Sequence, residues 1–139
     1  VENFVKLIKD EFFDGLIFHR VISGFMIQGG GMYADGRPKE TDSIKGEFKS
    51  NGFDNKLLHT RGVLSMARTM FPNSASSQFF ICVENTPHLD GQYAAFGKTI
   101  DEESKQVVLE VSQMPTGNLG GGFTDFPYEL IGIKTVNLL

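Results

Sequence analysis

Glycine is the residue that most limits what this chain can fold into. The 139 residues include 16 glycines, with triplets at 29–31 and 120–122, and the longest apolar run covers only residues 79–83. Glycine destabilises helix interiors and favours tight turns, so a bundle of long helices is excluded. A membrane-spanning helix is excluded as well, because it needs about 20 consecutive apolar residues. The pattern predicts short strands joined by turns.

The composition predicts a single globular domain over residues 1–139. Hydrophobic residues make up 40% of the chain and 13 residues are Phe, which is enough apolar side chain for a core and too much for a disordered chain. The net charge is −4 and no cluster of Lys and Arg is visible, so the sequence offers no surface for nucleic acid. We expect a monomer that binds neither nucleic acid nor membrane.

Cys82 is the only cysteine, so the chain cannot form an internal disulfide. It lies in the apolar stretch 78–83, where we expect a buried and inert thiol. A reducing compartment is compatible with this cysteine, and we expect the cytoplasm. The chain begins at Val1 rather than at Met and opens directly on a helical pattern, so we expect an N-terminally truncated domain.

The spacing of apolar residues predicts a mainly β fold with a helix at each end of the strand-rich part. Helices are predicted over residues 1–13 and 101–114, the second with Asp101 as its N-cap. A Gly-rich loop is predicted over residues 119–127. The predicted strands cover residues 16–22 and 25–29, which form a hairpin, and residues 44–48, 62–67, 78–83, 94–99 and 130–138.

Three familiar motifs come close but do not fit. Residues 91–99 resemble a phosphate-binding loop, yet five residues separate the two glycines where four are needed. A Ser–His–Asp hydrolase would draw on His19, His59 or His88 and on the serines of residues 74–77, but no serine lies in a Gly-x-Ser-x-Gly turn. We expect His19, in an apolar strand, to be a hydrogen-bonded structural imidazole. The histidine spacing and the single cysteine predict no metal site, and we expect no cofactor.

Arg20 interrupts an apolar strand and has no acidic residue near it in the sequence. A half-buried cation without a partner is costly, so this side chain either reaches solvent at a strand edge or donates to a ligand carbonyl. Met26 and Gln28 share one face of the next strand, and Gln78 and Phe80 share one face of a later strand. An amide beside a large aromatic ring is typical of a small-ligand site, although core packing alone would explain Phe80.

Three long blocks resemble the cyclophilin family of peptidyl-prolyl cis–trans isomerases, and its bacterial members most. They are FHRVISGFMIQGG at 18–30, TRGVLSMARTMFPNSASSQFFICV at 60–83 and HLDGQYAAFGKT at 88–99. The resemblance implies a cofactor-free isomerase acting on X–Pro bonds in proline-containing peptides and unfolded protein clients. It also implies a closed, eight-stranded β-barrel capped by two α-helices. Family members carry two strands before the first helix, and the chain lacks them.

The resemblance assigns roles residue by residue. Arg20 would be the catalytic cation, with Gln28 binding the substrate backbone beside it and Phe25 lining the proline pocket. Ala67 and Arg68 would offer backbone groups to an extended peptide. The full set of implied substrate-binding residues is Met26, Ala67, Arg68, Gln78, Phe80, His88, Leu89 and Tyr93.

Two positions depart from the family pattern. His88 stands where cyclosporin-sensitive members often have Trp, whose indole donates to the drug, so we expect weak or no cyclosporin binding with isomerase activity retained. Gly31 stands where an acidic residue is common. The alternative function is a non-catalytic module that binds proline-containing peptides.

Overall fold

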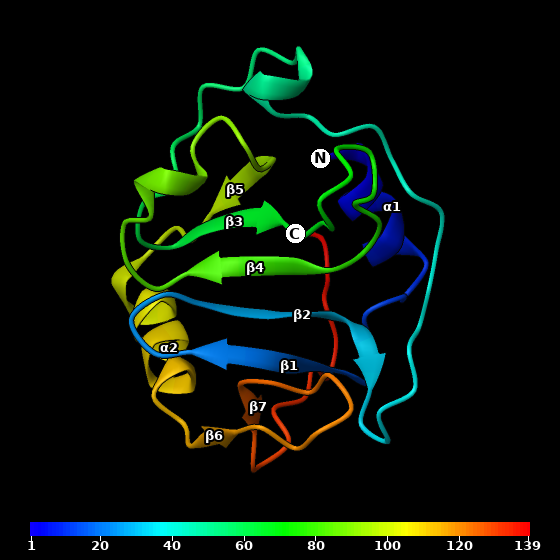
Figure 1. Ribbon diagram of the computed structural model, residues 1–139, viewed down its shortest axis with the longest axis vertical. Helices are drawn as coiled ribbons and strands as arrows, with labels where there is room; N and C mark the ends of the chain where they lie inside the picture. The colour runs from blue at the N-terminus through cyan, green and yellow to red at the C-terminus, as the bar shows by residue number, and fades with distance from the viewer.

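The computed structural model describes residues 1–139 and shows a five-stranded antiparallel sheet with α1 near one end of its strands and α2 near the other (Figure 1). The sheet order is β1-β2-β4-β3-β5, and β6 pairs with β7 separately. The mainly β class with two helices is confirmed, but β1 and β5 stand at the two ends of the sheet order and the strands are not joined into a closed barrel. The elements are α1 (Glu2–Lys9), β1 (Leu16–Ile22), β2 (Met26–Tyr33), β3 (Val63–Met66), β4 (Phe79–Cys82), β5 (Ala95–Lys98), α2 (Glu102–Ser112), β6 (Thr116–Gly117) and β7 (Phe126–Pro127), with short 3₁₀ turns at Lys49–Asn51 and Pro87–Leu89.

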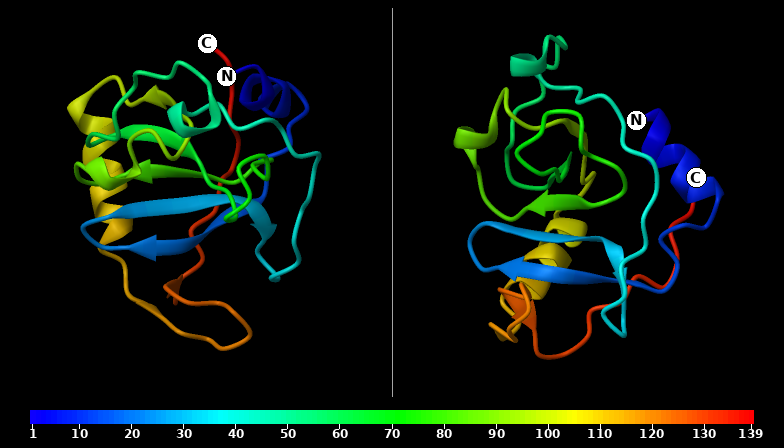
Figure 2. Two further views of the ribbon diagram at one scale, coloured as in Figure 1. Left: turned by 45° about the horizontal axis from the view of Figure 1, so that its top comes forward. Right: turned by 45° about the vertical axis from the view of Figure 1, so that its right-hand side comes forward.

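The two helices end and begin for local reasons. Helix α1 stops at Lys9, earlier than predicted, because Glu11 adopts a positive φ of 55° that a right-handed helix cannot continue through. Helix α2 begins as predicted: the Asp101 carboxylate accepts a hydrogen bond of 2.7 Å from the Ser104 N–H. Neither helix is long and apolar enough to span a membrane. The chain termini lie near each other in both views of Figure 2.

Two predicted strands are wrong. Residues 44–48 follow an irregular path, with the Ile44 N–H donating to the Ala75 carbonyl at 2.8 Å. Residues 130–138 meet β1 only briefly, through an isolated bridge between Gly132 and Ile17 and hydrogen bonds from and to Ile133. Apolar alternation predicts which side chains are buried, but a strand also needs a neighbour along its length, and this segment has one only at its start.

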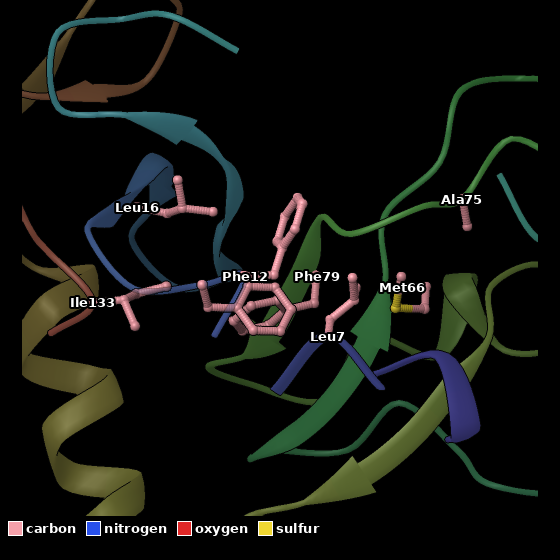
Figure 3. Close-up of a cluster of buried hydrophobic side chains, with 8 residues drawn as sticks. Leu7, Phe12, Leu16, Met66, Ala75, Phe79 and Ile133 are labelled. Carbon is pink, nitrogen blue, oxygen red and sulfur yellow. The ribbon is translucent and has the colours of Figure 1, made fainter. Parts of the chain in front are cut away.

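The core lies on both faces of the sheet, and the two helices cover one of them. Side chains alternate along β4, so Phe79 packs against residues of α1 and the following turn, whereas Phe80 and Cys82 pack in a separate cluster with Met26. The second face of β2 and β4 therefore carries a smaller buried cluster of its own. Figure 3 shows the first cluster, which consists of Leu7, Phe12, Phe13, Leu16, Met66, Ala75, Phe79 and Ile133.

Candidate active site

Three polar and aromatic side chains form a row across adjacent strands. Arg20 of β1 pairs with Gln28 of β2, and Gln28 pairs with Phe80 of β4. Directly opposed residues in an antiparallel sheet point to the same face. Phe18 pairs with Gly29 and Arg20 with Gln28, so His19 is the extra residue of a β-bulge immediately before Arg20. The bulge thus sets where the guanidinium enters the row.

A hollow of about 130 Å³ lies beside this row. Of the predicted site residues, only two lie outside the lining: Gln78 is in an adjoining polar hollow, and the ring of His88 lies 5.8 Å from that of Phe25. The lining residues are Arg20, Phe25, Met26, Gln28, Ala67, Arg68, Phe80, Leu89 and Tyr93.

Arg20 presents a guanidinium that makes no hydrogen bond to the protein. Its side chain is 44% exposed, and its one charged neighbour is Asp125, whose Oδ2 lies 4.0 Å from Arg20 Nε. The sequence shows no acidic residue near Arg20, and the structure supplies one from a distant loop. An exposed pair of this kind contributes only about 0–1 kcal/mol to stability. The guanidinium N–H groups of Arg20 therefore remain available to a ligand.

The polar side of the hollow is an amide pair. Gln28 Nε2 donates to Gln78 Oε1 at 3.0 Å, which fixes both side chains. Gly31 makes this possible, because a Cβ at that position would lie 2.5 Å from Gln78 Cγ. The departure from the family at Gly31 therefore has a steric role: it leaves room for Gln78.

The apolar floor of the hollow is supported from behind by a buried polar network. The His59 ring stacks on Phe80 with centroids 6.0 Å apart, and its Nε2 and Nδ1 lie 2.8 Å from Ser65 Oγ and 3.0 Å from Asp90 Oδ1. Burial lowers the pKa of His59 below its ordinary value, and the hydrogen bond and charge of Asp90 oppose this only in part. The neutral ring therefore donates from Nδ1 to the carboxylate and accepts at Nε2 from the Ser65 hydroxyl.

This network is the Ser–His–Asp arrangement that the sequence could not assemble, but it uses a different serine. Ser65 is fully buried, so its hydroxyl cannot reach a substrate. Ser77, one of the serines considered from the sequence, donates instead to the Gly30 carbonyl at 2.7 Å. His19 differs from expectation too, because its Nδ1 is buried without a hydrogen-bond partner. No three His, Cys, Asp or Glu side chains gather in a way that could hold a metal ion.

Ala67 and Arg68, which follow β3, form another wall of the hollow. The Ala67 N–H donates to the Gln78 carbonyl at 2.9 Å, so only its carbonyl is left for a peptide. The Arg68 guanidinium lies 4.6 Å from the ring centroids of both Phe48 and Tyr93 and donates to the Gln92 carbonyl. The resemblance implied only a backbone role for Arg68, whereas its side chain also packs against Phe48 and Tyr93 and lines the pocket.

Comparisons with known proteins agree with this fold. The family model for "Cyclophilin type peptidyl-prolyl cis-trans isomerase/CLD" matches residues 1–138. Peptidyl-prolyl cis-trans isomerase A of Dickeya dadantii is 42% identical over 98% of the chain, and a peptidyl-prolyl cis-trans isomerase of Acinetobacter baylyi is 46% identical over 86%. The chain spans 68% and 63% of the lengths of these two relatives.

A solved structure extends the comparison. A cyclophilin-type isomerase of Cryptosporidium parvum, crystallised in the presence of the dipeptide Ala-Pro, is 32% identical and superposes with a TM-score of 0.73, covering 96% of this chain and 80% of its own. The chain therefore belongs to the cyclophilin-type peptidyl-prolyl cis–trans isomerases.

Proposed function

We propose that the hollow beside β2 and β4 binds the ring of a peptidyl proline and that Arg20 catalyses rotation about the preceding peptide bond. The observation that carries this proposal is a guanidinium without intramolecular hydrogen bonds at the edge of an apolar pocket. The Ala-Pro dipeptide present with the C. parvum relative supports the choice of ligand.

The chemistry requires a donor and no nucleophile. The barrier to X–Pro rotation is roughly 18–20 kcal/mol because amide resonance is lost, and uncatalysed exchange takes tens to hundreds of seconds. When the bond twists, the prolyl nitrogen regains a lone pair that accepts a hydrogen bond. Arg20 donates to that nitrogen in the twisted state and not in the planar one, so it binds the transition state more strongly than either ground state.

The other residues position the peptide. Phe25, Met26, Phe80 and Leu89 hold the ring and keep water away from it. Gln28 donates to the substrate backbone beside Arg20, and the carbonyl of Ala67 accepts from a peptide N–H in the manner of an added strand. The substrates proposed are proline-containing peptides and unfolded protein clients.

Two further proposals, weak cyclosporin binding and a location in the cytoplasm, follow from His88 and from Cys82. An imidazole at His88 presents less apolar surface than an indole and another donor direction, which supports weak cyclosporin binding. The lone buried Cys82, whose pKa is raised by burial, supports a chain that functions without disulfides in a reducing compartment such as the cytoplasm. We propose a monomer as the working form.

A coupled protease assay on a proline-containing peptide tests the proposal. We expect Arg20→Ala to lower kcat/KM by about 10²- to 10³-fold, the effect of removing one transition-state donor, while peptide binding by NMR persists. Full activity in Arg20→Ala would contradict the role of Arg20. A wild-type protein that binds the peptide without cis–trans exchange broadening would instead be a non-catalytic binding module.

A further inference from the structure

Asp125 has a backbone conformation that most residues avoid. Its φ is 54°, and Glu11 is the only other non-glycine residue with a positive φ. Asp is among the few side chains that tolerate this left-handed region. The conformation is held on both sides: the Asp125 carbonyl accepts from the Val21 N–H at 2.9 Å, and buried Phe126 begins β7 immediately afterwards. The carboxylate therefore projects from a fixed point.

That fixed point lies next to the catalytic cation. Val21, which donates to Asp125, directly follows Arg20 in β1, so the backbone bond joins the loop to the strand one residue from the guanidinium. Asp125 Oδ2 lies 4.0 Å from Arg20 Nε, within ion-pair range but beyond hydrogen-bonding distance. The carboxylate attracts the guanidinium without occupying any of its N–H groups.

We propose that Asp125 is a positioning residue for Arg20: its charge, aimed from a left-handed loop residue, limits the guanidinium to the conformations that face the proline pocket. This inference rests on the proposed function. A half-exposed Arg side chain has many rotamers, and donation to the prolyl nitrogen requires one narrow set of them. Because Asp125 lies nearest Nε, the other N–H groups of the Arg20 guanidinium stay available to the substrate.

Two substitutions can separate the effect of the Asp125 charge from the effect of its backbone conformation. Asp125→Asn retains the tolerance for positive φ and removes the charge, while Asp125→Gly removes the side chain and suits the same φ. Neither variant strains the loop, so both should unfold at wild-type urea concentrations. Asp35→Asn is the control, because it removes the charge of another exposed Asp–Arg pair, with Arg37 Nε at 2.6 Å, outside the pocket lining.

The first measurement is the isomerase rate of the folded variants. We expect Asp125→Asn and Asp125→Gly to lower kcat/KM by about three- to tenfold, with the loss in kcat rather than KM, because the restraint matters only in the transition state. Asp35→Asn should match wild type. The rate of cis–trans exchange of the bound peptide, measured by NMR, should rank the variants in the same order.

Ionic strength provides a second measurement that a purely structural role would not affect. Salt at 1 M reduces the screening length to about 3 Å. The ratio of wild-type to Asp125→Asn rates should therefore fall toward one as salt is raised, while the ratio of wild type to Asp35→Asn stays constant. Equal rates of wild type and Asp125→Asn at low salt would overturn the inference alone. An inactive wild type would overturn the proposed function and this inference with it.

Discussion

The two sides of the proposed proline pocket are built in different ways. Met26 and Phe80 are 2% and 5% exposed and belong to β2 and β4, inside the sheet. Arg20 belongs to β1, at the end of the sheet order, with its side chain 44% exposed. The apolar side is therefore part of the hydrophobic core, whereas the cationic side is attached to an outer strand. On the apolar side, a substitution that weakens peptide binding should also lower stability. On the cationic side, a substitution should lower catalysis without lowering stability.

The largest expected effect is on the apolar side. Phe80→Ala should lower the free energy of unfolding by about 3–5 kcal/mol, because it removes a buried ring that packs on His59 and Tyr93. Urea denaturation measures the change. Phe71→Ala is the control, since that ring is 70% exposed, and it should stay within about 0.5 kcal/mol of wild type. A Phe80→Ala protein as stable as the control would show that the apolar side is separable from the core.

A smaller effect is expected in the buried hydrogen-bond network behind Phe80. Ser65→Ala removes the donor to His59 Nε2 and leaves a buried acceptor unsatisfied, which should cost about 1–3 kcal/mol. Ser43→Ala, at an exposed serine without hydrogen bonds, is the matched control. Urea midpoints compare the two variants. Equal midpoints would mean that the network contributes nothing to the apolar side.

Acid should destabilise the fold through two buried histidines, His59 and His19. Burial lowers the pKa of His59, and burial followed by the Arg20 charge lowers the pKa of His19. Below pH 6.5 the unfolded chain then binds protons that the folded chain does not, so stability is full above this pH and is lost as the pH falls toward the folded values. We expect a loss on the order of 1 kcal/mol between pH 7.5 and 5, measured by urea denaturation. A His59→Asn variant should show a shallower pH dependence, and an unchanged slope would remove His59 as its source.

The smallest expected effect is at the rim. The His88 ring lies 5.8 Å from the Phe25 ring. His88→Trp introduces an indole donor there, and cyclosporin should inhibit the variant several-fold more strongly, the size of one additional hydrogen bond. Because His88 is exposed, the unfolding free energy should change by less than about 0.5 kcal/mol. Unchanged inhibition would show that the rim does not control drug binding.

The features predicted from the sequence depend on local signals. The turn at Ser23–Gly24 between two apolar stretches predicts the β1–β2 hairpin, and Asp101 with its following acidic residues predicts the start of α2. The pocket lining could be named because the resemblance covers long blocks. The contacts of Asp125 with Arg20 and of His59 with Asp90 could not, since each joins residues far apart in the sequence with no spacing rule between them.

The row of Arg20, Gln28 and Phe80 makes the proposed active site dependent on correct strand alignment. A slip of β2 by one residue would turn Gln28 away and present Ile27 in its place. Neither the β1–β2 hairpin alone nor the β3–β4 pair alone contains the site. Catalytic competence should thus appear in a single step during refolding, when the distant pairing of β2 with β4 closes, and recovery of the enzyme's own turnover would time that event.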